Sequence, residues 1–307
     1  PLVYYAAWVC TGLAMRLTLY EAAFAALARV GGPAARRPMS QITFLGGLSV
    51  VIFWPMGQML ARHFGWRGAL LVYGAFALAT IPLHLAIPNT HYEETLEGHS
   101  GPRQAPLARN PRECLVAGSL YTVVTTLASF LNSGLSPNIL LMLGSFGLPV
   151  ATALWVSVLR GVGQSSARLC DIMFGKNTQP LMLNLLGALV LPLCFGVGLL
   201  SGQFIIAAVI LSFFSGVGNG IAAITRGTLP LVLFDHRTYG ALTGRLLAPS
   251  FLLSAVAPVT YASVIEGFGG NGALYLSMAL ALLMLMAAIA LKVMFSAGKE
   301  VGASLEI

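Results

Sequence analysis

Charged residues are scarce in this chain. Asp, Glu, Lys and Arg make up 9% of its 307 residues, whereas a soluble globular domain carries about 25%. Apolar residues make up 57% of the chain, and the mean hydropathy is +0.83. This composition excludes an ordinary soluble domain and indicates an integral membrane protein. An all-α bundle is expected, because an open sheet cannot satisfy its backbone hydrogen bonds in lipid.

Metal-binding and redox motifs are also lacking. The four cysteines, Cys10, Cys114, Cys170 and Cys194, are scattered without metal-ligand or redox spacing, so we interpret them as small packing residues. The five histidines and the carboxylates form no metal-binding cluster in sequence, and no phosphate-binding loop of an ATPase occurs. The sequence therefore predicts no metal, no cofactor and no catalytic residues, and the protein is not expected to be an enzyme.

The basic residues are spread over the segments between apolar runs. Twelve Lys and Arg residues fall in one set of connections and the C-terminal tail, whereas only Arg62 and Arg67 fall in the opposite set. Positive residues favour the cytoplasmic side of a membrane. The first set and the C-terminus are therefore predicted to be cytoplasmic, in a multi-pass protein of the cell membrane, most simply a bacterial inner membrane. A nucleic-acid partner is not expected, despite the net charge of +7.

The apolar runs predict nine membrane spans of about 20 residues or more. They cover residues 2–28, 38–61, 68–88, 113–142, 150–172, 180–200, 203–232, 240–265 and 272–295. The longest polar segment, 89–112, is predicted to be a cytoplasmic linker between residues 1–88 and a six-helix bundle in residues 113–307. The chain opens with Pro1 and has no signal-peptide pattern, so we expect three further spans upstream.

Several motifs resemble those of the major facilitator superfamily. They are "FGWRGALLVYGAF" at 64–76, "GVGQSSARLCDIMFGKN" at 161–177 and "RGTLPLVLF" at 226–234, and the last three spans weakly repeat the first three. The resemblance implies a fold of two six-span halves, of which this chain would cover spans four to twelve. It also implies alternating access to a midplane site. The expected partners are a small solute, the lipid bilayer and the missing N-terminal spans, and the protein is expected to act as a monomer.

Two charges lie inside the first apolar run. A formal charge at the centre of a bilayer costs ~2.5–3.5 kcal/mol on insertion scales, so Arg16 and Glu21 are candidates for a functional site. The repeat spacing places Arg226 at nearly the height of Glu21, and the two are predicted to pair across a cavity. Thr18 shares the helix face of Glu21, and Asn219 shares that of Arg226. Arg16 and Glu21 are five residues apart, about 140° around a regular helix, so they are not expected to pair with each other. Arg16 is expected to stack on Tyr20 or to reach a missing span.

Further polar residues allow two interpretations each. Asn132 and Ser136 lie with Ser133 and Asn138 beside Gly134 and Pro137, where we expect a kink in one span. They either contact substrate or hydrogen-bond a neighbouring helix. Trp54 either lines the cavity or packs at a proline kink.

The 161–177 motif contributes a candidate gate. Its residues Gln164, Arg168 and Asp171 either close the cytoplasmic end, as the resemblance implies, or include an exposed helix-end pair worth less than ~1 kcal/mol. The glycines of "SGVGNG" are interpreted as close helix packing and not as a nucleotide loop, because apolar helix flanks them on both sides.

These observations favour a secondary active transporter of a small solute. A proton is the expected coupling ion, because Glu21 is the only carboxylate placed deep in a span. A facilitator of the same fold is the nearest alternative. A membrane scaffold or an intramembrane enzyme with a nucleophile assembled in space is the more distant one.

Overall fold

The computed structural model describes residues 2–86, 106–108, 110–175, 178–235 and 238–303. These residues are almost entirely helical and contain no strand. Six helical stretches within them are long and apolar enough to cross a membrane: Leu2–Gly31, Met59–Leu85, Pro111–Ser145, Pro180–Gly198, Ile205–Leu233 and Tyr239–Ser296. The described part of the chain is thus all-helical, with apolar helices of the kind found in multi-pass membrane proteins. Most of the predicted 89–112 linker lies outside the described residues.

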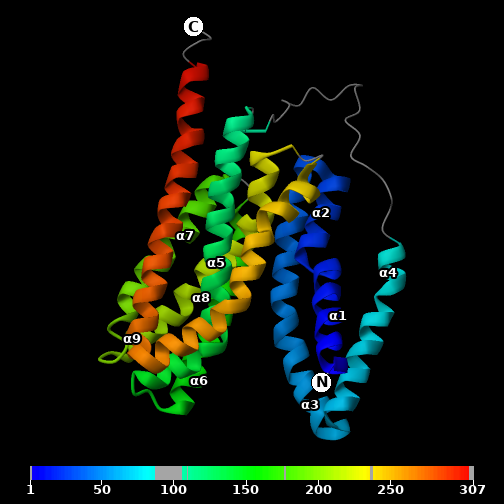
Figure 1. Cartoon of the computed structure of the whole chain (residues 1–307), viewed down its shortest axis with the longest axis vertical. Coiled ribbons are helices and arrows are strands. Elements are labelled where there is room, and N and C mark those ends of the chain that lie inside the picture. Colours follow the sequence, from blue (N-terminus) through cyan, green and yellow to red (C-terminus); the bar gives the residue numbers. More distant parts are fainter. Residues whose placement is uncertain (1, 87–105, 109, 176–177, 236–237, 304–307) are drawn as a thin grey trace.

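The N-terminal helices form one group, drawn in blue and cyan in Figure 1. They are α1 (Leu2–Thr18), α2 (Tyr20–Gly31), the 3-10 turn η1 (Gly32–Ala35), α3 (Arg36–Ala79) and α4 (Ile81–Leu85). The predicted unbroken span 2–28 is interrupted at Leu19, whose φ of −88° and ψ of −164° are extended. No residue of α1 is buried.

The C-terminal helices form a second, tighter group, drawn in green to red in Figure 1. They are α5 (Pro111–Ser145), α6 (Val150–Phe174), α7 (Pro180–Gly198), α8 (Ile205–Leu233) and α9 (Tyr239–Ala303). A capping box between Asn110 and Glu113 starts α5, which continues as one helix past Pro137. The prediction of a single helix there, in place of a helix and a long loop, is confirmed.

Two glycines reverse the chain within α3 and α9. Gly65 has φ 69° and ψ 173°, and Gly269 has φ 69° and ψ −174°. These backbone angles lie in a region that glycine alone adopts readily. In Figure 1 each of the two helices runs to one end of the molecule and then returns. The same local sequence pattern surrounds both turns, "FGWRG" at 64–68 and "FGGNG" at 268–272.

Glycines also bring α6 and α8 into close contact. A Cβ atom added to Gly216 would collide with the backbone carbonyl of Arg160, and one added to Gly220 would lie 2.6 Å from that of Gln164. Gly163 meets the carbonyl of Phe213 in the same way. The interpretation of "SGVGNG" as a packing motif is therefore confirmed.

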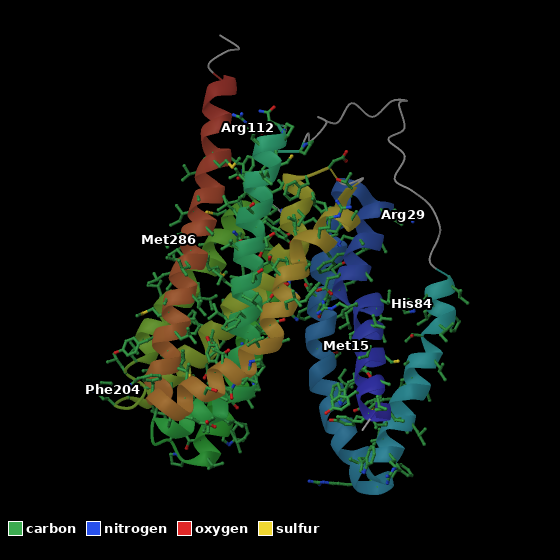
Figure 2. All side chains as sticks on the ribbon, in the orientation of Figure 1. Met15, Arg29, His84, Arg112, Phe204 and Met286 are labelled. Atoms are coloured by element: carbon green, nitrogen blue, oxygen red, sulfur yellow. The ribbon has the colours of Figure 1, made fainter. Side chains whose placement is uncertain are left out.

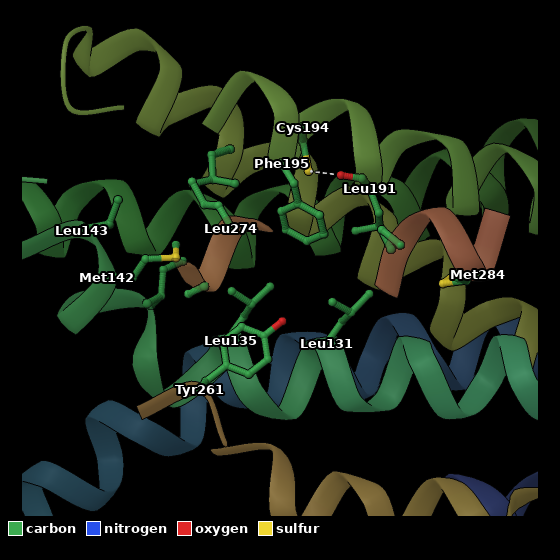
Figure 3. Close-up of a cluster of buried hydrophobic side chains, with 14 of the residues drawn as sticks. Leu131, Leu135, Met142, Leu143, Leu191, Cys194, Phe195, Tyr261, Leu274 and Met284 are labelled. Carbon is green, nitrogen blue, oxygen red and sulfur yellow. Dashed lines mark hydrogen bonds between the residues drawn. The ribbon is translucent and has the colours of Figure 1, made fainter. Parts of the chain in front are cut away.

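The core of the C-terminal group lies between α5, α6, α7, α8 and α9. Leu135 of α5, Phe195 of α7 and Leu274 of α9 are at most 4% exposed and belong to one cluster (Figure 3). The N-terminal group packs against this bundle through α2 and α3, which contact α6, α8 and α9. Figure 2 places Arg29 and Arg112, one from each group, at the same end of the molecule, and Phe204 at the other end.

Candidate functional site

An ion pair joins the two helical groups. Glu21 on α2 places Oε1 3.4 Å from Nη1 of Arg226 on α8. Their side chains are 22% and 26% exposed, so the pair is largely removed from solvent. Arg226 also donates a hydrogen bond from Nη2 to the hydroxyl of Ser129 on α5. The structure thus brings together Glu21 and Arg226, the two charged residues that the repeat spacing predicted to pair.

Arg16 joins this cluster, against expectation. Its Nη1 lies 3.6 Å from Oε1 of Glu21, so the prediction that the two residues would not pair is wrong. The rotation of 100° per residue on which that prediction relied does not hold across the break at Leu19. The guanidinium also lies 3.3 Å from the ring centroid of Phe251 on α9. Tyr20, the expected partner, stacks on Phe24 instead.

Two buried tyrosines hold the backbone of α8 beside this cluster. Tyr121 on α5 donates to the carbonyl of Arg226 at 2.7 Å, and Tyr239 on α9 donates to that of Gly227 at 2.9 Å. Both are at most 2% exposed. The absence of a Cβ at Gly227 also leaves room for the ring of Phe24 from α2. Sequence reasoning missed these tyrosines, although a buried tyrosine usually needs a partner for its hydroxyl.

Other predicted residues lie apart from the ion pair. Thr18 is exposed and donates to the carbonyl of Ala14 in its own helix at 2.8 Å. Ser136 is exposed on α5. Asn138 donates to the carbonyl of Pro258 at 3.0 Å, which ties α5 to α9 as the neighbouring-helix interpretation expected. The side chain of Trp54 lies outside what the structure describes.

A second polar site lies inside the C-terminal group. Arg160 on α6 donates from Nη2 to Oδ1 of Asn132 at 2.8 Å. Arg160, Asn132, Asn219 and Ser215 line one pocket together with apolar residues of α5, α7 and α8. The structure thus joins two predicted residues, Asn132 and Asn219, around an arginine to which the sequence assigned no role. The sequence contains a feature that could have identified it, because Arg160, like Arg16, is a charged residue within an apolar run.

The gate residues bind the opposite helical group. Arg168 Nη1 donates to the carbonyl of Thr43 on α3 at 2.7 Å, and Asp171 accepts a 2.7 Å hydrogen bond from the hydroxyl of Ser40. Arg168 is only 4% exposed. The alternative of an exposed Arg168–Asp171 pair is therefore wrong, because both side chains face α3.

The same contact extends along α6. Near the end of that helix, Arg36 donates from Nη2 to the carbonyl of Gly175 at 3.1 Å. Gln164 is half-buried, and its backbone lies against Gly220 on α8. Sequence reasoning did not identify Ser40, Thr43 or Arg36 as partners of the motif, because neither a serine nor a backbone carbonyl carries a distinctive pattern.

No protein-family model matches the chain, and no curated protein matches it with significant similarity. Among the described residues, no group of three or more His, Cys, Asp or Glu side chains is placed to hold a metal ion. The functional proposal therefore depends on the two inter-group contacts and the arginine pocket.

Proposed function

We propose that the protein is a secondary transporter of a small solute, in which the N-terminal and C-terminal helical groups rock about a site between them. The observation that supports it is that charged and polar side chains join the two groups through two sets of contacts. Glu21 on α2 pairs with Arg226 on α8, and α3 binds Arg168 and Asp171 of α6. Contacts of this kind can break and re-form as units, because each consists of a few directional bonds.

The internal repeat supports a fold of the major facilitator type. The turns at Gly65 and Gly269 share backbone angles and sequence, and each ends the first half of a reversing helix pair. Two equivalent halves related in this way are typical of that superfamily. Counting each half of α3 and α9, we assign nine spans to the chain, with the 89–112 linker and the C-terminus in the cytoplasm.

Glu21 is the group that we assign to proton coupling. It is the acidic partner of both Arg16 and Arg226, at 3.6 and 3.4 Å. Protonation of the carboxylate would weaken both contacts at once and so favour separation of the groups. A facilitator would use the same residues as a structural lock, and its transport would be independent of a proton gradient.

Distance measurements between spin labels test the rocking motion without knowledge of the substrate. In the full-length protein lacking its native cysteines, one label pair would occupy Arg37 and Gln179, and another would occupy Arg62 and Gln203 at the opposite end; all four positions are exposed. A transporter should show two distance populations at each end, and Arg168→Ala should shift the two ends in opposite directions. A control pair within the C-terminal group, Arg112 and Gln179, should stay constant. Single, unchanged distances at both ends in wild type and variant would indicate a static scaffold.

A further inference from the structure

Arg160 is a buried cation with no acidic partner in the part of the chain that the structure describes. It is 9% exposed, its Nε is buried without a hydrogen-bond partner among the described residues, and its Nη2 donates to the neutral amide of Asn132. Among the described residues no carboxylate forms a salt bridge with it. Arg226 differs in this respect, because Glu21 balances its charge.

An unbalanced charge in such a place is costly. Ionisable residues within membrane helices almost always face the bundle interior or a water-filled cavity, and they pair with one another or with backbone carbonyls. Arginine does not lose its proton in proteins, so this residue cannot become neutral to avoid the cost. The structure therefore provides a fixed positive charge at a place where an anion would lower the free energy of the folded state.

The pocket beside Arg160 has both polar and apolar lining residues. Its polar residues are Arg160, Asn132, Asn219 and Ser215. Figure 3 shows Leu131 and Leu135 of α5 facing Leu191 and Phe195 of α7, and these four leucine and phenylalanine side chains also line the pocket. The enclosed space holds about one water-sized group, and the pocket is partly open to its surroundings.

We propose that this pocket binds a small monocarboxylate with a short apolar tail. Guanidinium groups bind carboxylates through two parallel N–H···O bonds, and Arg160 has Nε free for one of them. The carboxylate would lie beside Arg160, and the tail would contact the leucines and Phe195. This inference deepens the proposed function, since the bound carboxylate would be the transported solute, but binding itself does not depend on transport.

The apolar lining residues favour an organic acid over an inorganic anion. Nitrate has the same planar, two-oxygen edge as a carboxylate, but it would leave the apolar lining residues without a partner. Burial of each methylene group contributes about 0.8 kcal/mol to transfer from water. A ligand series of increasing chain length can therefore separate the two anion types.

Calorimetric titration of the full-length protein with sodium propionate, at ionic strength held constant with sodium chloride, tests the site. Wild type should bind propionate saturably and more tightly than nitrate. Arg160→Gln should weaken binding by about 100-fold or more, because two charge-assisted hydrogen bonds are lost. Arg67→Gln, at an exposed arginine on α3, should bind as wild type does.

A second variant covers the case in which Arg160→Gln does not fold. Asn132→Asp places a carboxylate 2.8 Å from the guanidinium nitrogen, so it should raise the unfolding temperature and abolish propionate binding together. Absence of saturable binding to wild type, a preference for nitrate, or unchanged binding in both variants would overturn the site. If the binding test fails but the spin labels still show two distance populations, the proposed transport function is retained and only the binding site is refuted. If propionate binds but the two populations are absent, the binding site is retained and the transport function is refuted.

Discussion

Neutralising Glu21 should destabilise the protein measurably through the loss of one inter-group ion pair. Glu21→Gln keeps the volume and hydrogen-bonding capacity of the side chain but removes the charge that faces Arg226 at 3.4 Å and Arg16 at 3.6 Å. Two guanidinium groups are then left near each other without the carboxylate between them. The same loss of charge is expected to impair transport.

The size of the effect follows from distance and burial. Two unit charges 3.4 Å apart attract each other by roughly 5 kcal/mol at an effective dielectric constant of about 20. Desolvation offsets much of this attraction, and removing one partner of a fully buried pair costs ~3–5 kcal/mol. Glu21 and Arg226 keep 22% and 26% exposure, and Arg226 retains its bond to Ser129. We therefore expect a coupling energy of ~1–3 kcal/mol.

A double-mutant cycle of Glu21→Gln and Arg226→Gln measures that coupling as changes in the free energy of unfolding in mixed micelles. Glu266→Gln is the matched control, because Glu266 is an exposed carboxylate with no salt bridge among the described residues. The control should change the unfolding free energy by less than about 0.5 kcal/mol. The double charge swap, Glu21→Arg with Arg226→Glu, should recover folding but not transport. A coupling energy of zero, or equal effects of Glu21→Gln and Glu266→Gln, would refute a stabilising pair.

Three further outcomes are expected. Arg168→Ala should slow the transport cycle, measured as the turnover rate in proteoliposomes, while the amount of protein in the membrane stays near normal. Unchanged turnover would mean that Arg168 serves only to orient the protein in the membrane. Gly216→Val should lower the unfolding temperature strongly, because its side chain would strike the α6 backbone; an unchanged unfolding temperature would contradict the close helix approach. Single cysteines at Ser100 and Ser304 should resist an impermeant thiol reagent in intact cells, whereas one at Asn271 should react, and the reverse pattern would invert the assigned topology.

The helices and their turns could largely be predicted from the sequence. Hydropathy located the apolar helices, and the polar residues around Gly65 and Gly269 separated neighbouring spans at the points where the two glycines have positive φ angles. The break at Leu19 carried no such signal, because neither proline nor glycine stands there. That single extended residue changed the geometry enough to make Arg16 a partner of Glu21. Regular helix geometry predicts contacts only as far as the helix is unbroken.

The site could be predicted in part, for reasons that differ between its residues. The charges Glu21 and Arg226 were visible because a charge in an apolar run is costly wherever it lies. Asn132 was identified as polar, but its partner Arg160 lies on a different helix, and the sequence pattern does not show which side chains of two helices meet. The acceptor of Arg168 is the backbone carbonyl of Thr43. A backbone acceptor can lie at any residue, so no sequence pattern identifies it.

The two arginine sites share one side of α5 and of α8. Ser129 and Asn132 are three residues apart on α5, hence on the same face, and they bind Arg226 and Arg160 respectively. Asn219 and Arg226 are seven residues apart on α8, which again places them on one face. One cation is balanced by Glu21 from the other helical group, and the other lacks a carboxylate partner among the described residues. If the groups separate as proposed, Arg226 loses its carboxylate while a bound carboxylate supplies one negative charge to the same polar face. Binding of an anionic solute would then offset the electrostatic cost of separating the two groups. The solute would thereby favour the conformational change directly.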